Sequence, residues 1–170
     1  MQQQLIISGR GGQGVLTLTR LLAEAAAAQG LEVITSETHG MAQRGGAVIS
    51  MVKVGPFMGP LIPLGQADVA LFLQASNLPV HTCYLRPGAA VFVNSPLPGA
   101  YQAVDALQVA VSLALPPVSA NLVLLGFASA SDQLFCRADL LSQIITATIP
   151  ERWRAASLRA FEAGWQAWTP

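Results

Sequence analysis

The sequence predicts an α/β protein, with residues 1–170 forming one three-layer α/β/α domain in which helices cover both faces of a sheet. Three observations predict it. An apolar strand-like run, a glycine-rich loop and a helix-like run follow one another at the N-terminus, as at the start of a βαβ unit. Later strand-like runs are almost continuously apolar, as in a sheet covered on both faces. Beyond residue 105 the pattern is mainly helical.

The first half of the chain supplies the expected strands. Residues 5–7 start the sheet, and apolar residues at helical spacing predict a helix over 15–28 that ends before Gly30. Residues 76–84 predict a short helix, and Leu85-Arg86-Pro87-Gly88 predicts a turn. The remaining strands are expected at 32–35, 47–54, 68–73 and 89–93.

The second half supplies helices, expected over 105–115, 120–130, 138–149 and 152–168. Pro150 precedes the last of them, a position where a missing N–H is tolerated. Four large apolar side chains of this helix fall near one face, which predicts that they pack in the core: Trp153, Leu158, Phe161 and Trp165.

Charged residues are scarce in this chain. They make up 11% of it and apolar residues 52%, whereas an average soluble domain has about 25% charged residues. The apolar excess is spread along the chain, which favours a subunit that covers its surface with a partner over an isolated compact domain. Nine basic and nine acidic residues leave no net charge. The sequence therefore predicts no binding to nucleic acid or to an anionic membrane.

A cytoplasmic protein is expected, because no segment resembles a leader or a membrane span. The N-terminal Met-Gln-Gln-Gln leads directly into a strand, and the longest apolar stretch, 107–125, is interrupted by Pro116-Pro117. Cys83 and Cys136 match no metal or iron–sulfur spacing. Both are expected to be inert packing thiols.

The loop Gly9-Arg10-Gly11-Gly12-Gln13-Gly14 stands where α/β proteins bind phosphates. Its glycines allow positive φ, and its N–H groups precede the positive end of a helix. Val15 and Leu16 replace the lysine and hydroxyl of a P-loop, which argues against nucleotide hydrolysis. The glycines do match G-x-G-x-x-G, and Glu37 lies near the place of a ribose-binding acid. Dinucleotide binding, a purely structural turn and a role toward a partner subunit remain open.

A second polar segment, Ser36-Glu37-Thr38-His39-Gly40-Met41-Ala42-Gln43-Arg44-Gly45-Gly46, follows the second expected strand. It is expected to leave the carboxyl end of that strand beside the first glycine-rich loop, where α/β proteins place their ligands. Arg44 beside Gly45 and Gly46 is suited to a phosphate or carboxylate, and His39 to proton exchange near neutral pH. The alternative is a structural loop in which Arg44 pairs with Glu37.

The two segments together resemble the signature of the gamma subunit, or gamma-type domain, of 2-oxoacid:ferredoxin oxidoreductases. Within that family the residues His39-Gly40-Met41-Ala42-Gln43-Arg44-Gly45-Gly46 are most similar to the indolepyruvate type. Further similarities extend along nearly the whole chain, at Leu85 to Gly88, at Asn121 to Gly126 and at Arg159 to Gly164.

The resemblance implies an enzyme that oxidatively decarboxylates a 2-oxoacid with thiamine diphosphate, passes electrons through iron–sulfur clusters to ferredoxin, and forms an acyl-coenzyme A. It implies that this chain is inactive alone, completes the assembly and lines the approach to the active centre. Thiamine diphosphate, magnesium and iron–sulfur clusters are expected on partner subunits, and no firmly bound cofactor or metal on this chain. The isolated chain is expected to be either a monomer or a homodimer. The identity of the 2-oxoacid stays open.

No catalytic residue is expected on this chain. The N–H groups of Gly11 to Gly14 and the guanidinium of Arg44 are expected either to bind an anionic group, on coenzyme A or on the substrate, or to brace a partner's cofactor loop. The alternative function is a stand-alone dinucleotide-binding or regulatory module. The candidate cofactor-binding residues are Gly9, Arg10, Gly11, Gly12, Gln13, Gly14, Glu37, His39, Arg44, Gly45 and Gly46.

Overall fold

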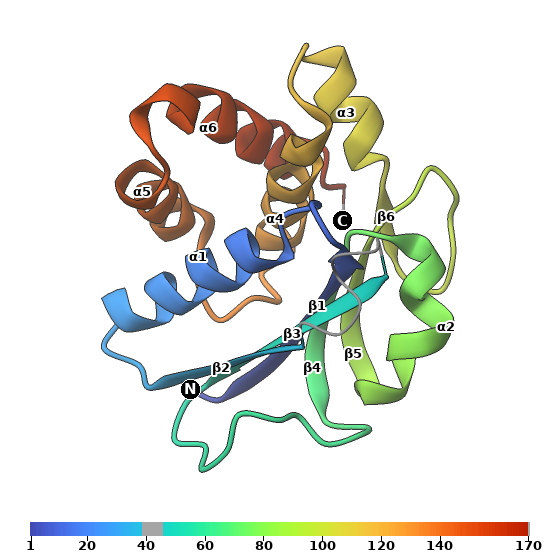
Figure 1. The fold of residues 1–170 in the computed structure, drawn as a ribbon, viewed down its shortest axis with the longest axis vertical. Helices are drawn as coiled ribbons and strands as arrows, with labels where there is room; N and C mark the ends of the chain where they lie inside the picture. The colour runs from blue at the N-terminus through green and yellow to red at the C-terminus, as the bar shows by residue number, and fades with distance from the viewer. Residues whose placement is uncertain (39–45, 170) are drawn as a thin grey trace.

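The computed structural model describes residues 1–38 and 46–169 and contains one sheet with helices on both faces (Figure 1). The sheet has six strands in the order β2-β3-β1-β4-β5-β6. The α/β class predicted from the sequence is confirmed. The strands are β1 (Gln3–Arg10), β2 (Val33–Thr38), β3 (Ala47–Val54), β4 (Ala67–Phe72), β5 (Leu85–Asn94) and β6 (Gln102–Val104).

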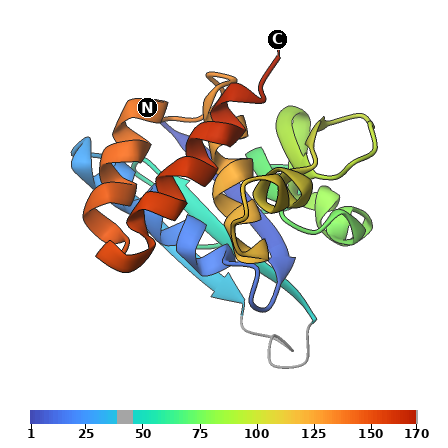
Figure 2. The same ribbon diagram turned by 90° about the horizontal axis from the view of Figure 1, so that it is seen from above.

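The helices form two unequal layers, as both views show (Figures 1 and 2). One layer is thick and contains α1 (Val15–Ala28), α3 (Ala106–Ser112), α4 (Ala120–Ser129), α5 (Ala138–Thr148) and α6 (Glu151–Gln166). The other is thin and contains α2 (Leu78–His81), flanked by the 3-10 turns η2 (Ala75–Asn77) and η3 (Thr82–Tyr84). A third 3-10 turn, η4 (Pro117–Ser119), leads into α4.

Strand β3 runs antiparallel to both of its neighbours, whereas β1, β4, β5 and β6 are mutually parallel. The first unit therefore differs from a simple βαβ unit. Strands β1 and β2 are parallel and joined by α1, but β3 lies between them. The reason is that only a short stretch of chain joins β2 to β3, and short connections favour antiparallel neighbours.

The predicted turn at residues 85–88 is wrong, because these residues belong to β5. Gly88 has a φ of 77° inside the strand, and the pairing of β4 with β5 changes register between Ala67 and Val69. Glycine thus supplies a bulge rather than a chain reversal. Strand β6 was not predicted, since three residues are too few for an alternating pattern to be recognised.

The core lies mainly under the thick helical layer. Leu5 and Ile7 of β1 point into it and meet Leu18 and Leu22 of α1, all with no exposed surface. A smaller cluster on the other face contains Ile6, Met51, Phe72 and Val93, among others. Helix α4 is buried along its whole length, which explains why its sequence is apolar on all sides.

Helix α6 contributes fewer core side chains than its pattern predicted. Phe161 is buried, but Trp153 and Trp165 are each 50% exposed, so the prediction that both pack in the core is wrong. The tryptophan that packs against the core is the half-buried Trp168, beyond the end of the helix. Its ring lies 5.1 Å from that of Phe127 and 6.2 Å from that of Phe92, measured between centroids.

The two cysteines differ in environment. Cys136 is buried, and burial raises the pKa of its thiol to about 12, so the expectation of an inert packing thiol is confirmed for it. Cys83 is exposed in η3, where its sulfur donates to the carbonyl oxygen of Val80, and the packing prediction is wrong there. Within the described ranges, no helix combines the length and apolarity that crossing a membrane requires.

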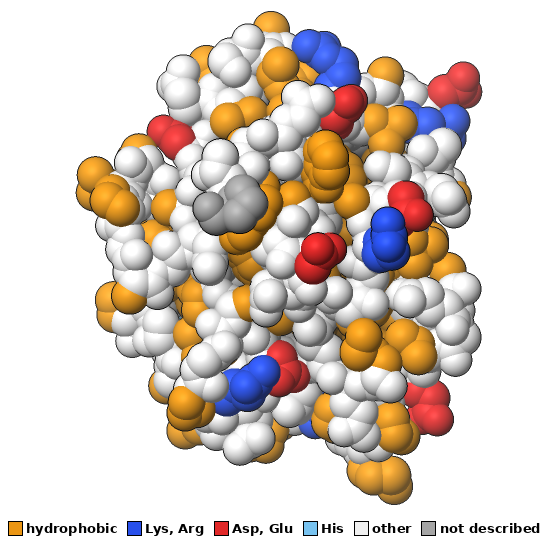
Figure 3. Space-filling model, turned by 180° about the vertical axis from the view of Figure 1, so that it is seen from behind, with side chains coloured by type: hydrophobic (Ala, Val, Ile, Leu, Met, Phe, Trp, Pro, Cys, Tyr) orange, Lys and Arg blue, Asp and Glu red, His pale blue; other side chains and the backbone are white. Residues whose placement is uncertain are grey.

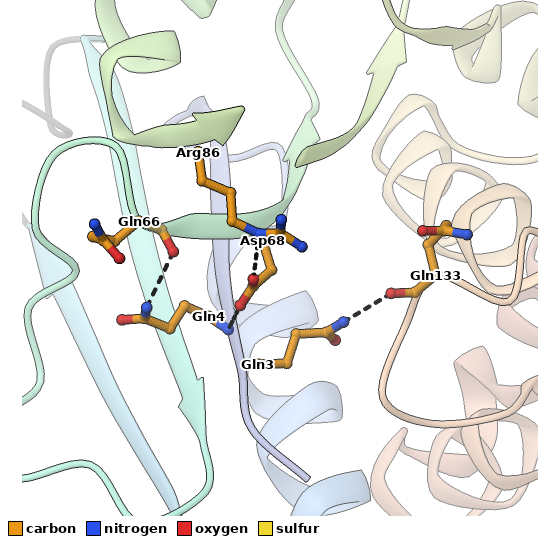
Figure 4. Close-up of polar contacts among 6 residues, drawn as sticks. All are labelled: Gln3, Gln4, Gln66, Asp68, Arg86 and Gln133. Carbon is orange, nitrogen blue, oxygen red and sulfur yellow. Dashed lines mark hydrogen bonds and ion pairs between the residues drawn. The ribbon is translucent and has the colours of Figure 1, made fainter. Parts of the chain in front are cut away.

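Hydrogen bonds of polar side chains hold the amino-terminal end of β1 in place (Figure 4). Asp68 accepts hydrogen bonds from the N–H of Gln4, at 2.7 Å, and from Nε of Arg86, at 2.6 Å. Gln3 donates through Nε2 to the carbonyl oxygen of Gln133. These contacts join β1 to β4, β5 and the segment before α5 at the edge of the sheet opposite the glycine-rich loop. They account structurally for Gln3 and Gln4 at the start of the chain.

Replacing Lys53 with methionine is expected to lower the free energy of unfolding by about 1–2 kcal/mol. Lys53 is only 7% exposed on β3; its Nζ donates to the carbonyl oxygen of Leu61 at 2.9 Å and lies 4.7 Å from the ring centroid of Phe57. Methionine keeps the buried stem but removes both contacts with the 55–66 connection. Urea denaturation measures the change. The exposed Arg20, changed to methionine as a control, is expected to stay within about 0.5 kcal/mol; equal effects would show that the ammonium group does not hold the connection.

Candidate functional site

The carboxyl ends of the parallel strands meet at one edge of the sheet. From this edge β1 leads through α1 to β2, on one side of the sheet, while β4 leads through α2 to β5 on the other side. The two crossovers cover opposite faces, because α1 packs in the larger core cluster and Leu78 of α2 in the smaller one. The boundary between β1 and β4 is therefore a topological switch point, where α/β sheets bind their ligands. Residues Gly9 to Gly14 lie directly at it.

The glycine-rich loop holds itself in shape through Gln13. The N–H of Gln13 donates to the carbonyl oxygen of Arg10 at 3.1 Å, and Oε1 of Gln13 accepts from the N–H of Arg10 at 2.7 Å. Its Nε2 donates to Oε1 of Gln74 at 3.0 Å, beyond the end of β4. Gln13 thus organises the loop, and its side chain has little capacity left for a ligand.

The glycines of the loop serve different purposes. A Cβ on Gly9 would lie 2.8 Å from Cγ2 of Val15 and 3.2 Å from Cβ of Leu73, so the backbone needs glycine to pack there. Gly14 has a φ of 84°, and a Cβ on it would overlap Nδ2 of Asn121. Gly12 has a φ of 86° but open space around it. Gly9 and Gly14 therefore allow close packing, while Gly12 only allows the turn.

Two helix N-termini open onto the same hollow, which has a volume of about 390 Å³. One wall comes from Gly11, Gly12 and Gln13 ahead of α1, and another from Ala120 and Asn121 at the start of α4. Neither helix has an acidic residue in its first turn or a side-chain cap. Their positive ends are consequently not neutralised from within, which suits an anionic group.

Asn121 was not among the residues predicted for the site. It is only 4% exposed, its Oδ1 accepts from the N–H of Leu122 at 2.6 Å, and its Nδ2 has no hydrogen-bond partner within the described part of the chain. It lines the hollow of the loop and also a second, mostly apolar hollow of about 290 Å³ that contains Trp153. The signal in the sequence was an asparagine at the start of a run that is otherwise apolar.

A buried polar cluster lies beneath the loop, formed by Ser8, Asn77 and His81. Nδ2 of Asn77 donates to Oγ of Ser8 at 3.0 Å and to the carbonyl oxygen of Gly9 at 2.8 Å. Oγ of Ser8 lies 2.8 Å from Nδ1 of His81. Because the serine oxygen already accepts from Asn77, we assign its proton to His81, whose Nδ1 is then the acceptor of a neutral ring. No motif in the sequence predicted this cluster.

Lowering the pH is expected to destabilise the protein through His81. Burial lowers the pKa of this imidazole from its ordinary value near 6.5, so the unfolded chain binds a proton more readily than the folded one. The stabilisation is complete above the ordinary pKa and is lost as the pH falls below it, toward the lowered value. Thermal unfolding of the wild type and of His81→Gln between pH 8 and pH 5 tests this. The melting temperature of the wild type should fall more steeply; parallel profiles would contradict the assignment.

Of the other predicted site residues, the structure places some beside the glycine-rich loop and others away from it. Arg10 is exposed at the end of β1, where it pairs in register with Ala47, so the half-buried Gly46 comes next to the loop. Glu37 is exposed within β2 and pairs in register with Ser50 of β3. Since β3 separates β2 from β1, the strand order does not reproduce the adjacent pair on which ribose recognition in dinucleotide folds relies. His39, Arg44 and Gly45 lie outside the described residues.

Within the described ranges, no three histidine, cysteine or acidic side chains gather into a candidate metal site.

Comparison with known proteins decides the family. Residues 4–167 match the family described as pyruvate ferredoxin/flavodoxin oxidoreductase. The chain belongs to this family.

Two relatives in sequence carry the same name. The chain is 31% identical to the indolepyruvate oxidoreductase subunit IorB of Thermococcus kodakarensis, over 96% of this chain and 94% of that subunit. It is 42% identical to the IorB subunit of Archaeoglobus fulgidus over 95 residues, which are 56% of this chain and 47% of that subunit. The resemblance to the indolepyruvate type, predicted from two segments, is confirmed.

Solved structures agree in fold. The gamma subunit of a keto/oxoacid ferredoxin oxidoreductase from Geobacter sulfurreducens superimposes with a TM-score of 0.78 at 25% identity, covering 96% of both chains. The 2-oxoglutarate:ferredoxin oxidoreductase of Magnetococcus marinus superimposes with a TM-score of 0.76 at 22% identity. That match covers 97% of this chain but only 30% of the other one. The same fold thus occurs both as a separate subunit and as part of a longer polypeptide.

Proposed function

We propose that this chain is the gamma-type subunit of a 2-oxoacid:ferredoxin oxidoreductase, most similar to the indolepyruvate type, and that it has no activity alone. Family membership supports the enzyme class. The observation that carries the role is the hollow at the carboxyl edge of the sheet, where the N-termini of α1 and α4 converge on the glycine-rich loop. The chain completes the assembly and lines the approach to an active centre held by its partners.

The oxidative decarboxylation belongs to partner subunits in this proposal. Thiamine diphosphate with its magnesium ion and the iron–sulfur clusters reside there, and electrons leave through the complex to ferredoxin. The two cysteines of this chain support that division, because Cys136 is buried and Cys83 lies exposed elsewhere, whereas a cluster needs several thiolates together. The whole assembly is proposed to be cytoplasmic.

Coenzyme A is the anionic ligand we propose for the hollow. The N–H groups of Gly11, Gly12 and Gly14 are suited to phosphate oxygens, since they precede a helix of fourteen residues. Nδ2 of Asn121, which has no hydrogen-bond partner among residues 1–38 and 46–169, adds a neutral donor. Arg10 is exposed beside them, and Arg44 follows in the second segment of the sequence. The Magnetococcus marinus enzyme was solved with coenzyme A bound, which supports this choice of ligand.

Bracing of a partner is the second role proposed for the same edge. Three apolar side chains that are 46–50% exposed line this hollow or the adjoining apolar one: Leu107, Val118 and Trp153. Seen from behind, the charged side chains are scattered among apolar and uncharged ones and form no patch of one sign (Figure 3). Only 11% of the residues are charged, and so low a proportion favours burial of surface against another subunit. Ligand contact and bracing are compatible, because the loop and the apolar side chains adjoin one another.

Replacing Arg44 with alanine is expected to weaken the assembled enzyme without unfolding the chain. A lost charge-assisted contact to a phosphate or carboxylate costs about 1.5–3 kcal/mol, or roughly ten- to a hundredfold in affinity. The measurements are the KM for coenzyme A and the yield of complex with partner subunits, compared with Arg20→Ala as a matched control on α1. Unchanged turnover together with unchanged complex formation would refute a role for Arg44.

A further inference from the structure

Asn77 uses its whole donor capacity beneath the glycine-rich loop. Its two Nδ2 protons go to the carbonyl oxygen of Gly9 and to Oγ of Ser8, at 2.8 Å and 3.0 Å. The Gly9 carbonyl is where the chain leaves the sheet and turns into the loop. Its direction sets the orientation of the peptide planes that follow, and so of the N–H groups that face the hollow.

Asn77 cannot reach a ligand in that hollow. Its side chain is 5% exposed, and both neighbours in its cluster are buried as well, Ser8 fully and His81 to all but 8%. Asn77 is absent from the lining of the hollow, although Gln74 of the same segment is part of it. Any influence of Asn77 on binding must therefore pass through the backbone of the loop.

The segment from Gln74 to Asn77 forms hydrogen bonds with the loop at two points. Besides the contact of Asn77 with Gly9, Oε1 of Gln74 accepts from Nε2 of Gln13 at 3.0 Å. Gln74 is itself held by Oγ of Ser76, to which its Nε2 donates at 3.2 Å. The connection after β4 thus fixes the first and the fifth residues of the glycine-rich loop, from below and from the side.

We propose that Asn77 is a positioning residue, which holds the Gly9 carbonyl so that the N–H groups of the loop converge on an anionic ligand or on a partner subunit. This inference rests on the proposed function of the loop. A loop whose backbone is already fixed binds a ligand more tightly than a mobile loop, because less backbone freedom is lost on binding. Asn77 is thereby distinguished from Ser8 and His81, which support the cluster without touching the loop carbonyl.

The test compares two variants in the assembled enzyme. Asn77→Asp is nearly isosteric but replaces the donor with an acceptor, whereas Ser8→Ala leaves the bond from Asn77 to Gly9 in place. The KM for coenzyme A, kcat and the yield of complex are measured for both, together with the melting temperature of each chain. Asn77→Asp is expected to raise the KM or lower the yield about tenfold, while Ser8→Ala changes either by less than about twofold despite a lower melting temperature.

Equal changes in the two variants, or none in Asn77→Asp, would overturn the positioning role. If Asn77→Asp does not fold, Asn77→Ser replaces it, because serine is too short to span the distance to Gly9 and carries no charge. The same outcomes then decide. A different result would show that the proposed function itself is wrong: Gly14→Ala and Arg44→Ala would then also leave the KM for coenzyme A and the yield of complex unchanged.

Discussion

Replacing Gly126 with alanine is expected to lower the free energy of unfolding by about 3 kcal/mol or more. Gly126 lies in α4, and a Cβ on it would overlap the carbonyl oxygen of Phe161 in α6. Gly164 mirrors it, since a Cβ there would overlap the carbonyl oxygen of Val123. Two backbones in such close contact cannot admit a methyl group unless the helices separate. Because α4 is buried along its length, separation opens the core that supports the loop.

Thermal denaturation measures this effect, and a fall in melting temperature of about 6–12 °C is expected for a chain of this size. Gly59→Ala is the matched control, because nothing lies within 4 Å of a Cβ at that position and its φ is not in the left-handed region. It should change the free energy of unfolding by less than about 0.5 kcal/mol. Similar melting temperatures for the two variants would show that α4 and α6 do not meet as described.

Replacing Gly14 with alanine is expected to impair the function of the loop strongly while most of the fold survives. The substitution has two costs: a positive φ, worth about 1–2 kcal/mol for a residue with a side chain, and the overlap with Nδ2 of Asn121. Relief of the overlap moves either the first turn of α1 or the start of α4, and both line the hollow. A rise of at least about tenfold in the KM for coenzyme A, or an equal loss of complex, is expected.

Gly12→Ala separates the two costs. Gly12 has nearly the same φ as Gly14, 86° against 84°, but open space where a Cβ would lie. It should lose a similar amount of stability from backbone strain and much less function. If both variants lose function equally, strain in the loop explains the loss and the contact with Asn121 is irrelevant. If neither loses function, the loop is only a turn between β1 and α1.

The fold could be predicted largely because each element carries a local signal. Helix α1 begins and ends where the glycines at 14 and 30 indicated, at Val15 and Ala28. The place of β3 could not be predicted, since an apolar strand with β-branched residues fits equally well beside β4 or between β1 and β2. The half exposure of Trp153 and Trp165 could not be predicted either, because the spacing of apolar residues on a helix does not reveal how wide the packed face is.

The candidate site was predictable only in its outline. The loop glycines at 9, 11, 12 and 14 predicted an unusual backbone, and two of them, Gly12 and Gly14, have positive φ. The residues that shape the loop from outside come from distant parts of the sequence: Asn77 follows β4 and Asn121 begins α4. No motif joins such residues, and only the folded chain brings them together. Glu37 shows the reverse case, in which a residue at the right sequence spacing belongs to a strand that does not neighbour β1.

Affinity purification of the full chain under anaerobic conditions from its own cells tests the central claim most directly. The account predicts that a thiamine-diphosphate protein and an iron–sulfur protein are recovered with it in fixed ratio, and that the complex turns over a 2-oxoacid with coenzyme A and ferredoxin. Recovery of the chain alone, with a nicotinamide or flavin nucleotide bound, would contradict the account and favour a stand-alone dinucleotide-binding module.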